Sequence, residues 1–232
     1  MTFHIITIFP RIFDSYFNES IIKRARKNKL IDIKIHNLRD WTTDKHKTVD
    51  DAPFGGSAGM VIKIEPLYMA LQAIKSQIPN PKFQTNSKFK IQNSKLILLS
   101  AKGKPWNQQT AKKYSKLDNI VLICGRYEGV DERITKFIDE EISIGDYVLT
   151  GGEIGAMGIV DSITRLLPGA LGNVDSAKNE SHAIPGVLEH PQYTRPEVFQ
   201  INKKSLKVPK ILLSGNHKKI EEWRKEHSKI KK

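Results

Sequence analysis

Two short segments of the chain are apolar at almost every position, and they constrain the fold more than any other feature of the sequence. They are residues 96–100 (LILLS) and residues 120–124 (IVLIC). A strand with one face in water alternates between apolar and polar residues, whereas a strand covered on both faces is apolar throughout. The two segments therefore predict buried strands of a mainly parallel sheet.

Predicted strands and helices alternate around these two segments. Residues 3–8 (FHIITI) and 31–38 (IDIKIHNL) predict two further strands, and apolar residues at three- and four-residue spacing predict helices over 11–28, 64–78 and 107–117. This alternation predicts an α/β fold with helices on both faces of the sheet. Ligands bind beyond the carboxyl ends of strands in such sheets. The segments AKG and GRYEG, which follow LILLS and IVLIC, are therefore expected at a binding site.

The second half of the chain indicates a linker and a small second domain. Residues 170–190 have few apolar positions and no period, which is typical of a functional loop or a domain boundary. Residues 1–169 are then the first domain and residues 191–232 a second, with a short strand at 211–213 and a helix that begins near His217, capped by Asn216.

Residues 79–95 (PNPKFQTNSKFKIQNSK) differ in composition from their surroundings. They are rich in proline, asparagine, serine and lysine, and NSK occurs twice. We expect a surface insertion with no catalytic role. A basic arm that touches RNA is the alternative.

The charge of the chain favours an anionic partner. The formal net charge is +13, and residues 201–232 hold eleven Lys or Arg against three Glu. Nucleic acid is the leading candidate for such a basic chain. A generally basic proteome, in which lysine only solvates the surface, is the alternative.

Cysteine content and hydropathy bear on the compartment. Cys124 is the only cysteine, so no disulfide can form within one chain, which fits a reducing compartment. No apolar run reaches the roughly 18–20 residues that a membrane span requires. We therefore expect a cytoplasmic protein with no membrane contact.

An acidic segment rich in glycine interrupts this basic chain. Residues 121–161 hold nine Asp or Glu against three Lys or Arg, and glycines occur at positions that include 125, 129, 145, 151 and 152. The segment matches neither the P-loop nor the dinucleotide fingerprint, which argues against phosphate binding. Glycine lets the backbone approach a flat ligand closely, and Glu128, Asp146 and Glu153 would tolerate a positive centre. Tight turns alone are the alternative explanation for the glycines.

Several blocks of the sequence together resemble the TrmD family of bacterial tRNA (guanine-N1-)-methyltransferases. These blocks are FPRIFDSYF, TVDDAPFGGSAGM, ICGRYEGVDERI, SIGDYVLTGGE, DSITRLLPGALG, HPQYTRPE and LLSGNH. They occur in order from residue 1 to about residue 217, interrupted chiefly by residues 79–95.

The resemblance implies a fold, an activity and an assembly. The family belongs to the SPOUT methyltransferases, so the first domain would contain a trefoil knot and the second would be a small, mostly helical tRNA-binding domain. The family transfers a methyl group from S-adenosyl-L-methionine to N1 of guanosine 37, beside the anticodon of tRNA. It acts as a homodimer whose active sites are shared between subunits.

The resemblance also assigns cofactor-binding positions in three loops. By match to the family's motifs, the residues expected to hold S-adenosyl-L-methionine are Leu99, Ser100, Gly125, Tyr127, Glu128, Gly129, Ile144, Gly145, Asp146, Tyr147, Val148, Leu149, Gly151 and Gly152.

Methylation at N1 of guanine needs a base, because this nitrogen carries a hydrogen in the neutral purine. A carboxylate can accept hydrogen bonds from N1 and the adjacent amine and remove the proton. The family uses an aspartate in the linker, and the matching residue here is Glu180, with Asp175 as the reserve. Arg165 matches the family's catalytic arginine and would stabilise negative charge on the base.

The chain departs from the family pattern at further positions, which leaves alternatives open. Ala101 and Gly155 replace frequent prolines, and the chain stops about fifteen residues after SGNH. A tRNA-binding homologue with impaired catalysis is therefore the second hypothesis. A SPOUT enzyme that acts on ribosomal RNA or on another tRNA position is the third.

No metal site is expected in the protein itself. The seven histidines show no ligand spacing, and His46 is expected to be a polar loop residue. The tRNA substrate could bring a magnesium ion with it.

Overall fold

The computed structural model describes residues 1–78, 93–172, 180–202 and 204–230. They divide into two compact units, Met1–Gly172 and Asn173–Lys232, and each unit is described here by itself. Most of the segment 79–95 lies outside the described residues. Its last two residues, Ser94 and Lys95, do not belong to an insertion, because they are the first residues of a strand.

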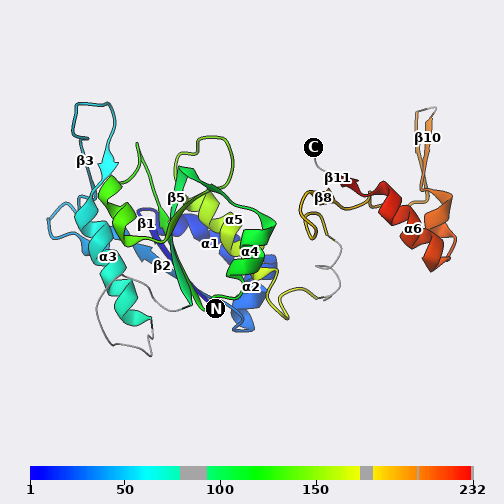
Figure 1. Cartoon of the computed structure of the whole chain (residues 1–232), viewed down its shortest axis with the longest axis horizontal. Coiled ribbons are helices and arrows are strands. Elements are labelled where there is room, and N and C mark those ends of the chain that lie inside the picture. The colour runs from blue at the N-terminus through cyan, green and yellow to red at the C-terminus, as the bar shows by residue number, and fades with distance from the viewer. Residues whose placement is uncertain (79–92, 173–179, 203, 231–232) are drawn as a thin grey trace. The chain divides into compact units, whose positions relative to one another are not determined.

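A five-stranded sheet forms the centre of the first unit (Figure 1). Its strand order is β2-β1-β6-β5-β7, and every neighbouring pair is parallel. The predicted mainly parallel sheet is thus confirmed. The strands are β1 (Thr2–Thr7), β2 (Asp32–Asn37), β5 (Ser94–Pro105), β6 (Asn119–Cys124) and β7 (Glu140–Ser143).

The apolar strands are covered on both faces, as their composition predicted. Leu96 and Leu98 of β5 belong to one hydrophobic core, whereas Ile97 and Leu99 belong to the other. Since successive side chains of a strand point to opposite faces, a strand between two cores must be apolar at each position. The edge strand β2 alternates instead, because only part of it is covered.

Helices cover both faces of the sheet. Helix α3 (Ile64–Gln77) packs on one core, together with the 3₁₀ helices η2 (Leu38–Trp41) and η3 (Glu132–Phe137). Figure 1 shows α3 on the opposite side of the sheet from the second group of helices. That group supplies residues to the other core, and its members are η1 (Pro10–Phe13), α1 (Asp14–Phe17), α2 (Ser20–Lys27), α4 (Gln108–Tyr114) and α5 (Glu153–Thr164).

The prediction of one continuous helix over residues 11–28 is wrong. The chain forms η1, α1 and α2 in succession there, and Ser20 has a positive φ of 46°. Side chains satisfy the end of α1, since Asn18 Nδ2 donates to Asp14 O at 2.8 Å and Arg26 Nη1 donates to Phe17 O at 3.1 Å. The sequence keeps the apolar spacing of a single helix, because α1 and α2 both direct their apolar residues to the same core.

The remaining elements of the first unit include some that the sequence did not predict. Helix α3 is confirmed, and α4 is shorter than the predicted 107–117. Strand β7 and helix α5 had no prediction. A two-residue strand pair, β3 (Asp50–Asp51) with β4 (Val61–Ile62), is antiparallel.

The described residues of the second unit form one α-helix, one 3₁₀ helix and four short strands. Helix α6 (His217–His227) begins at Asn216, whose side chain accepts a hydrogen bond from Lys219 N at 3.1 Å, so the predicted helix start is confirmed. The predicted strand at 211–213 is wrong, because η5 (Lys210–Leu213) is a 3₁₀ helix that follows Pro209. The strands are β8 (Val187–Leu188), β9 (Val198–Ile201), β10 (Lys204–Lys207) and β11 (Lys229–Ile230).

Strand pairing in this unit also reaches into the predicted linker. Strands β9 and β10 form an antiparallel pair, and β8 pairs antiparallel with β11. Residues 187–188 therefore form a strand, although the sequence there shows no hydrophobic periodicity. Residues 173–179 lie outside the described part of the chain.

A pair of histidines links β1 to β2. His4 is 2% exposed, and its Nδ1 lies 3.0 Å from His36 Nε2, with the two rings stacked. Burial, followed by the positive charges of His36 and Lys34, lowers the pKa of His4 to about 4, although Asp32 acts in the opposite direction. Burial and Lys34 also lower the pKa of His36.

We expect this pair to make the fold sensitive to acid. The pKa of His4 is about 6.5 in the unfolded chain, so below that pH the unfolded state binds more protons than the folded state. The free energy of unfolding should therefore fall between pH 6.5 and about 4 and be insensitive to His4 above pH 6.5. Denaturant titrations across this range should show a smaller fall for His4→Phe. His46→Phe, at an exposed loop position, is the control; an equal slope in all three proteins would contradict the prediction.

Candidate functional site

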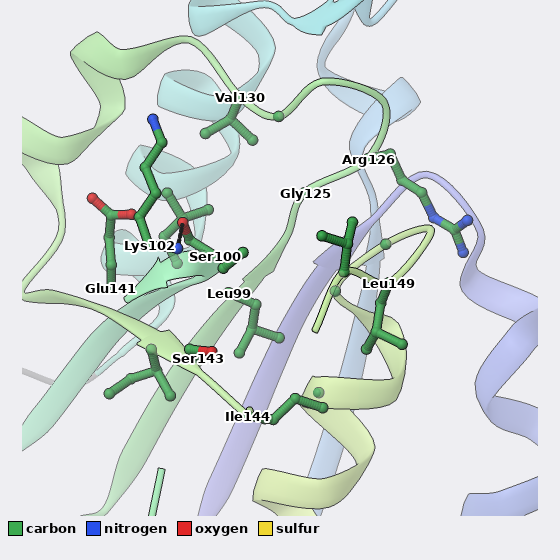
Figure 2. Close-up of a pocket in the computed structure, with 18 of the residues that line it drawn as sticks. Leu99, Ser100, Lys102, Gly125, Arg126, Val130, Glu141, Ser143, Ile144 and Leu149 are labelled. Carbon is green, nitrogen blue, oxygen red and sulfur yellow. Dashed lines mark hydrogen bonds between the residues drawn. The ribbon is translucent and has the colours of Figure 1, made fainter. Parts of the chain in front are cut away.

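A cavity of about 260 Å³ opens at the carboxyl edge of the sheet, at the three neighbouring strands β6, β5 and β7 (Figure 2). Residues 98–102, 125–130 and 141–145 supply most of its walls, and Glu132, residues 147–152 and Gly155 complete it. These segments follow or end the strands, which is where ligands bind in open parallel sheets. The cavity therefore occupies the expected position.

The structure brings nearly all the residues expected to hold a cofactor to this cavity. Asp146 is the exception, because its side chain is exposed and does not line the cavity. The expected residues that line it are Leu99, Ser100, Gly125, Tyr127, Glu128, Gly129, Ile144, Gly145, Tyr147, Val148, Leu149, Gly151 and Gly152.

The first wall comes from an excursion within β5. Both Leu99 and Lys104 pair with Ile142 of β7, so residues 100–103 leave the ladder between them. Gly103 makes this path possible, because a Cβ built on it would lie 2.4 Å from Ile142 N. The excursion places Ser100, Ala101 and Lys102 on the cavity.

The second wall follows β6 and is braced by a neighbouring loop. Glu128 N donates to Met60 O at 3.0 Å, and Ile62 N donates to Gly129 O at 3.0 Å. Gly59 lies against Glu128, since a Cβ on it would be 2.5 Å from Glu128 Cγ. The glycine-rich loop 53–60 thus adjoins the cavity wall and limits where Glu128 can move.

The third wall combines the end of β7 with the start of α5. Ser143 Oγ donates to Gly145 O at 2.9 Å and accepts from Gly145 N at 3.2 Å, which fixes the turn after β7. Gly152 N donates to Gly125 O at 2.9 Å and so joins this wall to the second. Gly152 fits because it lacks a side chain.

A buried ion pair fixes the outer side of that wall. Arg126 Nε and Nη2 each lie 3.0 Å from Glu153 Oε2, and the Glu153 side chain is 1% exposed. Thr7 Oγ1 donates to the other carboxylate oxygen of Glu153 at 2.8 Å. Arg126 Nη1 donates to Thr150 O at 3.1 Å, and its guanidinium lies 4.7 Å from the centre of the Phe9 ring.

The lining combines apolar side chains with carboxylates. Leu99, Ile144 and Leu149 offer apolar surface, and in Figure 2 Leu149 and Arg126 lie on the opposite side of the view from Lys102 and Glu141. Glu128 and Glu141 have no ion-pair partner among the described residues. Such a cavity can accept a partly apolar ligand with a positive centre, and it disfavours an anion.

Several lining residues are not among those that the family's motifs assign to cofactor binding. Val130, Glu132 and Glu141 belong to the acidic segment, and Lys102 follows LILLS; Lys102 Nζ lies 3.9 Å from Glu132 Oε2. Lys102 belongs to the segment AKG, which the rule that ligands bind at the carboxyl ends of strands had already placed at a binding site. Glu141 could not have been found in this way, because strand β7 was not predicted.

The two residues expected to act on the substrate belong to different units. Arg165 lies in the first unit, directly after α5, and its backbone N–H donates to Asp161 O at 3.1 Å. It does not line the cavity. Glu180 lies in the second unit, and the reserve candidate Asp175 lies outside the described residues.

A hydrogen bond of Tyr16 joins α1 to α5, one helical turn before Arg165. Tyr16 OH donates to Asp161 Oδ2 at 2.6 Å. This hydrogen bond, with smaller contributions from burial and the carboxylate charge, raises the pKa of Tyr16 to about 12. Tyr16 therefore stays neutral at physiological pH, and Asp161 has a defined partner next to Arg165.

We expect the two glycines of this wall to respond differently to an added methyl group. Gly152→Ala would place a Cβ 2.9 Å from Cys124 Cα and 3.1 Å from Leu99 Cβ, so the backbone must shift, at a cost of about 1–3 kcal/mol. Gly155→Ala is the matched control, because its Cβ would meet only Ile144 and Leu99 side chains at an ordinary 3.5 Å. Thermal unfolding should show the loss for Gly152→Ala alone; equal stability of both variants would contradict the geometry.

The described residues contain no group of three or more His, Cys, Asp or Glu side chains placed to hold a metal ion.

Burial raises the pKa of the Cys124 thiol well above its usual value, so this thiol stays protonated. Among the described helices, none has both the length and the apolar character to cross a bilayer.

Comparison with known proteins gives consistent matches over the whole chain. The family model described as tRNA (Guanine-1)-methyltransferase TrmD matches residues 1–232. A tRNA (guanine-N(1)-)-methyltransferase of Citrifermentans bemidjiense is 52% identical over 226 residues, which cover 97% of this chain and 84% of that protein. Proteins of the same name from Dictyoglomus turgidum and Enterococcus faecalis are 50% and 46% identical, and the alignments cover 97% and 98% of this chain and 83% and 86% of theirs.

Proposed function

The chain belongs to the TrmD family of tRNA (guanine-1)-methyltransferases, and we propose that it transfers the methyl group of S-adenosyl-L-methionine to N1 of guanosine 37 in tRNA. The observation that carries this proposal is the cavity at β6, β5 and β7. Three loops that match the family's cofactor-binding motifs line this one cavity. The net charge of +13 fits a polyanionic substrate.

The residues of the cavity fit S-adenosyl-L-methionine. When bound, this cofactor supplies an electrophilic methyl group on a positively charged sulfur. Leu99, Ile144 and Leu149 would pack on its adenine ring, and the carboxylates of Glu128 and Glu141 would offset its positive charge. Gly125 and Gly152 carry no side chain at the point where their walls meet, so the ring would be able to approach the backbone closely there.

Two side chains are proposed to act on the guanine. The Glu180 carboxylate accepts the proton from N1, which turns this nitrogen into a nucleophile. The Arg165 guanidinium stabilises the negative charge that then develops on the neighbouring carbonyl oxygen. The support for both roles is their match to the family's catalytic positions. Asp175 remains the reserve base.

We propose that the active enzyme is a homodimer with shared active sites, as the family resemblance implies. Exposed apolar side chains in the first unit support a protein partner there, since water disfavours such surface. They include Ile12, Tyr16 and Ile154, which are 39%, 43% and 57% exposed. Val148, at 88%, lies in a loop of the cavity itself.

The remaining expectations concern the organisation of the chain. We propose that the first domain, residues 1–169, carries the family's trefoil knot around the cavity, and that residues 170–190 link it to a tRNA-binding domain, residues 191–232. The basic residues of 201–232 support the last assignment. A magnesium ion would enter with the tRNA, and the tRNA substrate places the reaction in the cytoplasm.

A methyl-transfer assay tests the proposal. The protein is incubated with radiolabelled S-adenosyl-L-methionine and a tRNA transcript that carries G36 and G37, with a G37-to-A transcript as the matched control. We expect label only in the first transcript, and mass spectrometry of nuclease fragments should place the methyl group on guanosine 37. Tight tRNA binding without transfer would favour the catalytically impaired homologue, and a methyl group elsewhere would favour a different SPOUT activity.

A further inference from the structure

A second cavity lies entirely within the second unit, at residues to which no role in cofactor binding or catalysis has been assigned. Its volume is about 510 Å³, which is within the range of small-molecule sites. The residues that line it are His190, Pro191, Gln192, Tyr193, Leu212, His217, Ile220, Glu221 and Arg224.

Helix α6 builds one wall of this cavity. His217, Ile220, Glu221 and Arg224 follow one another at spacings of three, one and three residues, so they share one face of the helix. The capping bond of Asn216 fixes where that helix begins and therefore which side chains this face carries.

The facing wall is held in place by Trp223. The Trp223 ring lies 6.2 Å from the His190 ring and 6.3 Å from the Tyr193 ring, and it stacks on His227 at 4.1 Å. Residues 190–193 are thus attached to the helix by aromatic contacts. Both walls of the cavity exist without a ligand, which lowers the ordering cost of binding.

The lining suits a planar polar ligand. Leu212 and Ile220 are half-buried and apolar, and Tyr193 is 49% exposed, which leaves surface for stacking. Arg224 and His217 bring hydrogen-bond donors, and Glu221 brings an acceptor. Arg224 Nη1 lies 3.9 Å from Glu221 Oε2, which offsets the charge of the arginine and disfavours a phosphate group.

We propose that this cavity binds an unpaired nucleobase from a loop of the RNA substrate. The inference rests on the proposed function, because it takes tRNA as the substrate. RNA loops present unstacked bases that proteins hold by stacking on aromatic rings and by hydrogen bonds to the base edges. The surrounding lysines would hold the phosphate backbone, while the cavity fixes the register of the loop.

The test compares two charge-neutralising variants on the same helix. Arg224→Gln removes a cavity residue, whereas Lys225→Gln removes the same charge one position away, outside the lining. Affinity for an anticodon stem-loop RNA is measured without any methyl donor. We expect Arg224→Gln to weaken binding about tenfold and Tyr193→Ala by at least about fivefold. Lys225→Gln should weaken it less than threefold, as expected for one phosphate contact.

A second measurement identifies the base. Each unpaired position of the stem-loop is replaced in turn by an abasic site, and binding is measured for the native protein and for Arg224→Gln. One abasic position should weaken binding to the native protein but not weaken binding to the variant further. Equal effects of Arg224→Gln and Lys225→Gln, with no position that shows this coupling, would overturn the proposal. Binding that shows this coupling while guanosine 37 is not methylated would instead overturn only the proposed activity.

Discussion

Glu180→Gln should reduce methylation of tRNA by about 10²–10⁴-fold, the usual contribution of a general acid or base. The amide keeps the size of the side chain but cannot take the proton from N1 of guanine. Binding of S-adenosyl-L-methionine should change little, because Glu180 does not line the cavity and its proposed role is on the guanine. Single-turnover rates and calorimetric cofactor binding measure the two effects separately.

Two further variants show whether the effect belongs to this carboxylate. Glu197→Gln changes an exposed glutamate of the second unit and should leave the rate unchanged. Asp175→Asn tests the reserve base. If Asp175→Asn removes activity while Glu180→Gln retains it, the assignment of the base to Glu180 is wrong.

The same variants can test whether the active site is shared between subunits. Mixtures of Arg165→Ala chains with Glu180→Gln chains should recover part of the activity, because a mixed dimer would contain one site with both residues intact. Each variant alone supplies the baseline. No recovery in a mixture shown to exchange subunits would argue against shared sites.

Arg126→Ala should lower the free energy of unfolding by about 3 kcal/mol or more, because it leaves the Glu153 carboxylate buried without its cation. The 1% exposure of Glu153 makes this penalty large, and among the described residues Thr7 alone remains as a hydrogen-bond donor to that carboxylate. The segment 150–152 also loses the bond from Arg126 to Thr150 O. We therefore expect weaker cofactor binding in addition to lower stability.

An exposed ion pair provides the matched control for this prediction. Arg133 Nη2 lies 2.6 Å from Asp131 Oδ2, and hydrogen bonds from Arg133 lower the pKa of Asp131, but the Arg133 side chain is 63% exposed. Arg133→Ala should cost about 0–1 kcal/mol, as exposed pairs do. Urea unfolding of both variants makes the comparison. Equal losses would show that burial of Glu153 does not decide the cost.

Much of the sheet was predictable from the sequence, because a strand that is buried on both faces is apolar at each successive residue. The runs LILLS and IVLIC identified β5 and β6, and the position after them identified the region of the cavity. The failures have local causes. Strand β7 begins with two glutamates, so its sequence lacks the apolar run that identified β5 and β6. Residues 11–28 have apolar residues at helical spacing, although the helix breaks after Phe17.

The sequence by itself determined the fold class and which motifs belong to one family, since residue type records burial and family motifs are continuous in the chain. Only the tertiary structure decided which distant segments meet. It placed Gly152 against Gly125, paired Glu153 with both Arg126 and Thr7, and left Asp146 off the cavity. The physical reason is that these contacts depend on backbone paths and packing distances between residues far apart in sequence, which no local pattern encodes.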